Sequence, residues 1–129
     1  MYQVTEQVLD LNTLMRSLLK AGDVGSVVIH CAVVRGISGQ MITSSATYTA
    51  LPGAEAELER IGSELKAKWR IEDIALVRRT GCLAPGEIIS VVGVAAAHRE
   101  EAFSACEEAV TRLKEMKCIK KEEVLEDRS

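Results

Sequence analysis

What this 129-residue sequence lacks already excludes several classes of protein. Aromatic residues make up only 3% of it, so the core must be aliphatic. The longest apolar run, around residues 27–34, is far shorter than the roughly 20 residues that a membrane-spanning helix needs. The first four residues do not open a basic and then hydrophobic signal sequence. We therefore expect a cytoplasmic protein with no membrane segment.

The sequence also lacks an excess of positive charge. Sixteen Lys and Arg residues face nineteen Asp and Glu residues, which gives a formal net charge of −3. This balance argues against a domain whose whole surface binds nucleic acid, so any basic site must be a local patch. With 47% hydrophobic and 27% charged residues and no low-complexity run, the chain has the composition of one globular domain.

Sequence motifs for metals and nucleotides are absent as well. There is no phosphate-binding glycine loop, no HExxH and no GxSxG, and the two histidines are too far apart in sequence to suggest a metal pair. The four cysteines form no CxxC pair, which favours reduced thiols that mostly fill the core over a zinc or redox site. We expect neither a metal nor a bound cofactor.

The hydrophobic periodicity predicts an α+β domain over residues 1–116. Helices are expected from Asp10 to Gly22, after Pro52–Gly53 and from His98, and an N-terminal strand at residues 2–5. Further strands are predicted at 26–35, 42–50, 71–79 and 87–97, with Ile42, Ala46 and Tyr48 on one face of the second of these and a hairpin joining the last two. This order predicts a mainly antiparallel sheet with flanking helices. Residues 117–129 form a charged C-terminal tail, whose simplest interpretation is a solvated or frayed end.

The informative side chains are basic and lie at the ends of the predicted elements. His98 and Arg99 open a helix, where free backbone N–H groups and the helix dipole favour an anion. For each basic residue a surface role is the simpler alternative, such as a pair between Arg99 and a neighbouring glutamate. The remaining candidates are Arg35, Arg78, Arg79, Lys114, Lys120 and Lys121.

One ordered set of motifs resembles a known family. Residues 79–87 read RTGCLAPGE, residues 91–94 read VVGV, and His98–Arg99 is followed by AFSAC at 102–106 and by Leu113–Lys114. In this order and spacing they resemble the large, catalytic subunit of molybdopterin synthase, and the match extends over residues 24–123. The resemblance implies an α/β hammerhead fold and a homodimer that binds one small subunit at each end. It also implies a sulfur transferase, which converts cyclic pyranopterin monophosphate to molybdopterin with sulfur from the thiocarboxylated end of that ubiquitin-like small subunit.

The same resemblance implies roles for individual residues. Lys114 corresponds to one catalytic lysine, and either Lys120 or Lys121 corresponds to the other. The active-site part of the tail is then residues 118–123. The substrate-binding residues implied are Val34, Arg35, His98, Arg99 and Glu122.

The chain departs from the family pattern at two places that bear on activity. The family's Pro-x-Trp-Lys-Lys-Glu reads Cys-Ile-Lys-Lys-Glu at residues 118–122, and Arg78 replaces a histidine. A catalytically weakened or inactive homologue, serving as a dimeric binding partner of a ubiquitin-like protein, is therefore the alternative.

Independently of the family, sixteen helical residues from His98 to Lys114 span about 24 Å. Because one small pterin cannot contact both ends, we expect a site shared between two copies of the chain.

Overall fold

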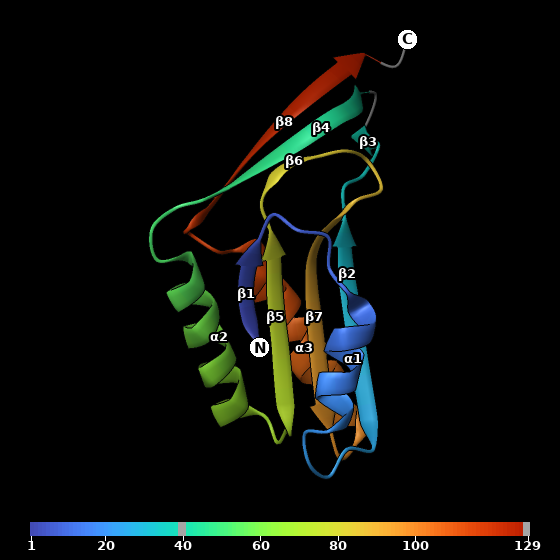
Figure 1. The fold of residues 1–129 in the computed structure, drawn as a ribbon, viewed down its shortest axis with the longest axis vertical. Coiled ribbons are helices and arrows are strands. Elements are labelled where there is room, and N and C mark those ends of the chain that lie inside the picture. The colour runs from blue at the N-terminus through green and yellow to red at the C-terminus, as the bar shows by residue number, and fades with distance from the viewer. Residues whose placement is uncertain (39–40, 128–129) are drawn as a thin grey trace.

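The computed structural model describes residues 1–38 and 41–127 and forms two sheets with three helices (Figure 1). The α+β class and the antiparallel character predicted above are confirmed, since only β1 and β5 pair in parallel. In chain order the elements are β1 (Tyr2–Thr5), α1 (Leu11–Leu19), β2 (Ser26–Val33), β3 (Ile37–Ser38), β4 (Met41–Ala50), α2 (Ala54–Lys68), β5 (Asp73–Arg79), β6 (Gly81–Leu83), β7 (Ile88–Ala96), α3 (Arg99–Lys114) and β8 (Ile119–Asp127).

The larger sheet has the strand order β1-β5-β7-β2 and is covered by helices on both faces (Figure 1). Alternation along β5 distributes its side chains: Ile74 and Leu76 pack against α2 and α3, whereas Ala75 and Val77 pack against α1. The contact with α1 is close, because a Cβ on Gly93 of β7 would lie 2.6 Å from a methyl carbon of Leu18. A side chain at position 93 would therefore require Leu18 and Leu14 of α1 to shift.

The smaller sheet is an arm that extends from one end of the larger sheet (Figure 1). Its strands follow the order β3-β4-β6, and β8 pairs with β4 along nearly the whole length of both strands. In place of a frayed terminus, residues 119–127 thus form a strand. The sequence pattern did not predict β8 because its charged residues show no apolar alternation.

A β-bulge in β4 overturns one predicted position. The pairing with β8 shifts between Thr43 and Ser45, so that one extra residue is accommodated in β4. The inward face therefore carries Thr43, Ala46 and Tyr48, all of which are buried, and Ile42 is 40% exposed. The prediction that Ile42 shares a face with Ala46 and Tyr48 was wrong, because a bulge reverses the alternation of a strand.

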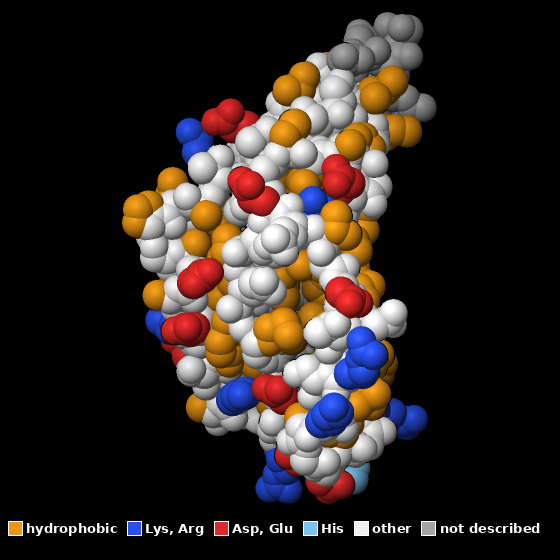
Figure 2. Space-filling view, viewed as in Figure 1, with side chains coloured by type: hydrophobic (Ala, Val, Ile, Leu, Met, Phe, Trp, Pro, Cys, Tyr) orange, Lys and Arg blue, Asp and Glu red, His pale blue; other side chains and the backbone are white. Residues whose placement is uncertain are grey.

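Apolar side chains are exposed along the arm. Figure 2 shows hydrophobic atoms gathered over this part of the surface, and exposed residues of β3, β4 and β8 account for them. They are Ile37, Ile42, Val124 and Leu125. Because Val124 and Leu125 are neighbours on β8, they point to opposite sides of the arm, and exposed apolar area of this kind is typical of a surface that contacts another molecule.

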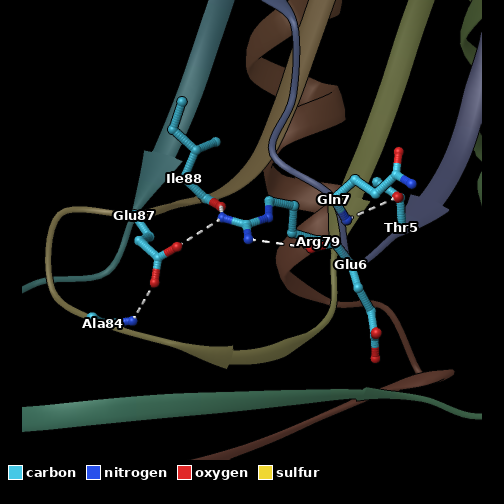
Figure 3. A network of polar contacts seen from close by, with 7 residues as sticks. All are labelled: Thr5, Glu6, Gln7, Arg79, Ala84, Glu87 and Ile88. Carbon is cyan, nitrogen blue, oxygen red and sulfur yellow. Dashed lines mark hydrogen bonds and ion pairs between the residues drawn. The ribbon is translucent and has the colours of Figure 1, made fainter.

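Two side chains fix the loops at the junction of sheet and arm. Asp10 caps α1 as predicted, its Oδ1 accepting from the backbone N–H of Asn12 at 3.0 Å. Arg79 is buried and donates to Glu87 and to the carbonyl oxygen of Glu6, both at 3.3 Å (Figure 3). Glu87 in turn accepts from the backbone N–H of Ala84, and this bond and Arg79 lower the pKa of Glu87. Arg79 thus holds the β6–β7 turn in place and is not available to bind an anionic ligand.

The cysteines only partly follow the prediction that they fill the core. Cys106 is buried, Cys31 and Cys118 are half-buried and Cys82 is exposed; all four are free thiols. Burial raises the pKa of Cys106 to about 11, so this thiol is inert at neutral pH.

No helix in the described part of the chain is long and apolar enough to cross a membrane.

Candidate functional site

A cleft of about 630 Å³ lies where the larger sheet, the arm and the end of α3 meet. Its walls come from the last residues of β2 and α3, from the carboxyl end of β5, and from the paired strands β4 and β8. The polar and charged residues that line it are His30, Arg35, Thr43, Tyr48, Arg78, Ser90, Lys114, Lys121 and Glu123. Four of these side chains carry a permanent positive charge and one carries a negative charge, so the cleft favours anions.

Pairing between β4 and β8 determines which of the two tail lysines faces this cleft. Lys121 lies opposite Tyr48, and the next inward position pairs Glu123 with Ala46. Facing residues of an antiparallel pair share one side of the sheet, and neighbouring residues point to opposite sides. Lys121 therefore lies on the cleft side with Tyr48, and Lys120 lies on the outer side.

The outer side of β8 carries the other two predicted site residues of the tail. Lys120 and Glu122 pair with each other at 3.3 Å, and their side chains are 64% and 70% exposed. Neither residue lines the cleft. The structure thus distinguishes the two adjacent lysines, which the sequence left as alternatives.

Lys121 is held in place by two neighbours. Its Nζ pairs with Glu123 and lies 6.0 Å from the centre of the Tyr48 ring. The hydrogen bond that Lys121 donates to Glu123 raises the pKa of Lys121, which therefore remains protonated at neutral pH. A cation held between a carboxylate and an aromatic ring is restrained in position while its charge stays available to a ligand.

Three other predicted residues lie at the same cleft. Lys114 is the last residue of α3, and its exposed side chain faces the opening. Val34 is buried, and its backbone pairs with Glu87 and Gly86 at 3.0 and 2.9 Å. Arg35 follows it and is exposed at the rim. The structure therefore brings Lys114 and Lys121, which are seven residues apart, to the same cleft as the end of β2, which is far from both in sequence.

His98 and Arg99 lie at the other end of α3 and do not line this cleft. Arg99 pairs with Glu100 at 3.6 Å, and both side chains are more than 70% exposed. The length of α3 separates them from Lys114 by about 24 Å within one chain. If they bind the same ligand as Lys114, they must do so from a second copy.

Sequence reasoning missed the contribution of Arg78 and Tyr48 to the site. Arg78 was considered only as a basic residue at a strand end, yet it is buried and lines the cleft. Strand alternation could have predicted this position of Arg78. Ile74 and Leu76 of β5 face α3, so Arg78, two residues further on, is expected on the same side. Tyr48 was assigned to the inward face of its strand, and its ring lies 5.5 Å from the guanidinium carbon of Arg78.

A carboxylate at the start of α2 anchors the connection between α3 and β8. Glu57 accepts hydrogen bonds from the backbone N–H groups of Lys117 and Cys118, both at 2.9 Å. Burial alone would raise the pKa of Glu57, but these two bonds outweigh it and lower the pKa below its ordinary value. Because this connection joins the elements that carry Lys114 and Lys121, Glu57 sets the distance between the two lysines.

We expect Glu57→Gln to lower stability at neutral pH by about 1 kcal/mol, since it removes the charge from two hydrogen bonds. A folded-state pKa below the unfolded value means that this stability is present above about pH 4.5 and is lost as pH falls further. Urea unfolding of both proteins at pH 7 and pH 4 measures it, with Glu59→Gln on the exposed side of α2 as the control. An equal difference at both pH values would contradict the assigned role.

The described residues contain no group of three or more His, Cys, Asp or Glu side chains that could hold a metal ion. The cleft is instead built from ammonium and guanidinium groups. Such groups bind oxyanions and stabilise negative charge that develops during a reaction. The fold and the site together define an α+β hammerhead protein with a cleft lined mainly by cationic side chains.

Comparison with known proteins identifies the family. The family model described as MoaE protein matches residues 4–116. The molybdopterin synthase catalytic subunit of Staphylococcus carnosus is 35% identical over 104 residues, which cover 80% of this chain and 69% of that protein. Its counterpart in Staphylococcus aureus strain N315 is 36% identical over 106 residues, covering 81% and 72%.

Solved structures agree with this result. The crystal structure of molybdopterin synthase from Staphylococcus aureus matches with a TM-score of 0.90 and 29% identity, over 98% of this chain and 92% of that one. The MoaE protein of Burkholderia ambifaria matches with a TM-score of 0.80 and 28% identity, over 98% and 90%. A Helicobacter pylori complex of subunits 1 and 2 of the molybdopterin-converting factor shares the fold at 14% identity. The chain belongs to the MoaE protein family, and its function, as an enzyme, lies in molybdopterin synthesis.

Proposed function

We propose that the protein is the large, catalytic subunit of molybdopterin synthase and acts as a sulfur transferase. The substrate is cyclic pyranopterin monophosphate, and the sulfur comes from the C-terminal thiocarboxylate of a ubiquitin-like small subunit. The observation that carries this proposal is the convergence of Lys114 and Lys121 on one cleft, from elements that are separate in the fold. Staphylococcal relatives of the chain bear the name of this catalytic subunit.

The two lysines have complementary tasks in such a reaction. A thiocarboxylate is an anion, and sulfur attack on the pterin side chain displaces a phosphate oxygen, so negative charge shifts across the site. Two ammonium groups that line one cleft can hold the thiocarboxylate and stabilise the leaving oxygen. Arg35 at the rim adds a third cation for the phosphate.

A protein partner suits the surface next to this cleft. The strand that carries Lys121 also carries the exposed apolar residues Val124 and Leu125. A ubiquitin-like subunit that covers the apolar arm would bring its C-terminus to the cleft. The Helicobacter pylori protein of the same fold was solved as a complex of two subunits.

A homodimer would complete the site with His98 and Arg99. These residues begin α3, and one turn further Phe103 is 61% exposed, which is unusual for a large aromatic side chain outside an interface. The edge strand β2 runs along the same length, from the His98 end to Arg35 at the cleft. A two-fold axis beside β2 would therefore place His98 and Arg99 of one copy at the cleft of the other.

Arg99→Ala should weaken binding of cyclic pyranopterin monophosphate by about 1.5 to 3 kcal/mol, the value of a lost charged hydrogen bond. To show that the residue acts across the dimer, Arg99→Ala and Lys114→Ala chains are mixed and assayed at low substrate concentration. A shared site leaves each mixed dimer with one intact cleft, so about a quarter of wild-type activity should return. If the two residues act within one chain, mixing restores nothing.

The function itself is tested by combining the protein with a thiocarboxylated small subunit and cyclic pyranopterin monophosphate. Molybdopterin formation by the native protein is the expected result. A folded dimer that binds the small subunit but yields no product would favour the alternative of an inactive binding partner. It would also assign the loss to the altered segment at residues 118–122.

A further inference from the structure

Arg78 is a buried cation on the wall of the cleft that the protein itself does not neutralise. It is 7% exposed, and its Nη1 donates one hydrogen bond, 3.1 Å long, to the carbonyl oxygen of Leu113. Its Nε is buried without a hydrogen-bond partner. Among the side chains that the structure describes, those of residues 1–37 and 41–125, the guanidinium forms no ion pair with a carboxylate.

The surroundings of Arg78 compensate its charge only in part. Burial lowers the pKa of Arg78, and the influence of Tyr48 and Glu57 in the opposite direction does not reverse this. Glu57 is already engaged by two backbone N–H groups, and Glu123 pairs with Lys121. A buried charge without a partner costs stability, so its presence at a cleft indicates that a ligand supplies the missing anion.

Arg79 shows that this arrangement is particular to Arg78. The two residues are adjacent on β5 and equally buried, but strand alternation sends them to opposite faces. The Nε of Arg79 also lacks a hydrogen-bond partner, but Arg79 forms an ion pair with Glu87 and donates to two backbone carbonyls. The fold thus neutralises one of two neighbouring buried arginines and leaves the other facing the cleft.

We propose that Arg78 is a ligand-binding residue that holds an oxyanion against the wall formed by Tyr48 and Ser90. This inference rests on the proposed function and adds a binding group to the residues that the family resemblance implied, which did not include position 78. The oxyanion is either the phosphate of the pterin or the terminal thiocarboxylate of the sulfur donor. A guanidinium has five donors in a planar fork and can bind either group through two of them.

The test compares Arg78→Gln and Arg78→Lys with the native protein, and Arg60→Gln on the exposed face of α2 is the matched control. Glutamine keeps an amide donor at the position of the arginine Nε but carries no charge. The first arm measures the affinity of the large subunit alone for cyclic pyranopterin monophosphate. The second arm measures its affinity for the carboxylate form of the small subunit, with and without the last residue of that subunit.

Arg78→Gln should weaken binding at least tenfold in one arm, and that arm identifies the source of the oxyanion. Arg78→Lys should lose less because it keeps the charge, and the Arg60 control should stay within twofold. The melting temperature of Arg78→Gln should be unchanged or higher, because an unpaired buried charge is removed. Affinities within twofold in both arms, or a lower melting temperature with unchanged affinity, would overturn the proposal and make Arg78 a structural residue.

Neither arm depends on turnover, so the two proposals can fail separately. Inorganic phosphate serves as a probe without the pterin: it should raise the melting temperature of the native protein, and this effect should disappear in Arg78→Gln. Phosphate stabilisation that is lost in the variant, without any molybdopterin from the native protein, would support the oxyanion site and reject the enzyme. If the native protein forms molybdopterin but phosphate raises the melting temperature of both proteins equally, the enzyme is supported and the oxyanion site at Arg78 is rejected.

Discussion

Replacing Lys114 by alanine should reduce molybdopterin formation by at least about 100-fold, as expected when a group that stabilises developing charge is removed. The side chain lies at the end of α3, is exposed and lines the cleft. Stability should therefore change by less than about 0.5 kcal/mol. Single-turnover product formation and urea unfolding measure the two effects separately.

Lys117→Ala is the matched control for this substitution. Lys117 is an exposed lysine three residues further along the chain that does not line the cleft. It should retain product formation within twofold of the native protein. Activity of Lys114→Ala close to that of Lys117→Ala would remove Lys114 from the reaction.

Alanine substitutions of the two adjacent lysines of β8 should differ strongly in their effect on product formation. Lys121→Ala should lower product formation by about 100-fold, since it removes a cation from the cleft and leaves Glu123 facing the anionic ligand without its partner. Lys120→Ala should stay within twofold, because Lys120 pairs with Glu122 on the outer face. Both variants keep the strand pairing, so product formation compares the two side chains directly.

A second variant separates the two consequences of losing Lys121. Lys121→Ala combined with Glu123→Gln removes the lysine without leaving an unpaired carboxylate. We expect it to recover part of the lost substrate affinity but little of the lost rate. Equal losses in Lys120→Ala and Lys121→Ala would show that the orientation of β8 in the active complex differs from the pairing with β4 described above.

The cleft illustrates a division between residues that stabilise the fold and residues that serve a ligand. Arg79 pairs with Glu87, Glu57 accepts from two backbone N–H groups, and these contacts hold a turn and a connection in place. Arg78 and Lys114 have few or no such partners and face the cleft. Substituting a residue of the first kind should lower stability, whereas substituting one of the second kind should lower binding or rate.

Much of the fold could be predicted from the sequence because it depends on local periodicity. The Asp10 cap, the helix after Pro52–Gly53 and the strand after Gly25 each follow from residues within a few positions of one another, although that strand lies at the sheet edge and is only half-buried. The family motif identified Lys114 as a candidate. The rise per residue of a helix was enough to separate Lys114 from His98, because both residues belong to one continuous helical segment.

The tertiary structure decided what depends on residues far apart in the chain. Whether Lys120 or Lys121 faces the cleft follows from pairing between β8 and β4, more than 70 positions away, and the bulge in β4 that exposes Ile42 appears in the same pairing. Arg78 faces the cleft and Arg79 pairs with Glu87, and this difference depends on which helix or loop covers each face of β5. Local sequence determines the elements because hydrogen bonding and side-chain alternation are short-range, but a shift of one residue in non-local pairing reverses which side chains reach the site.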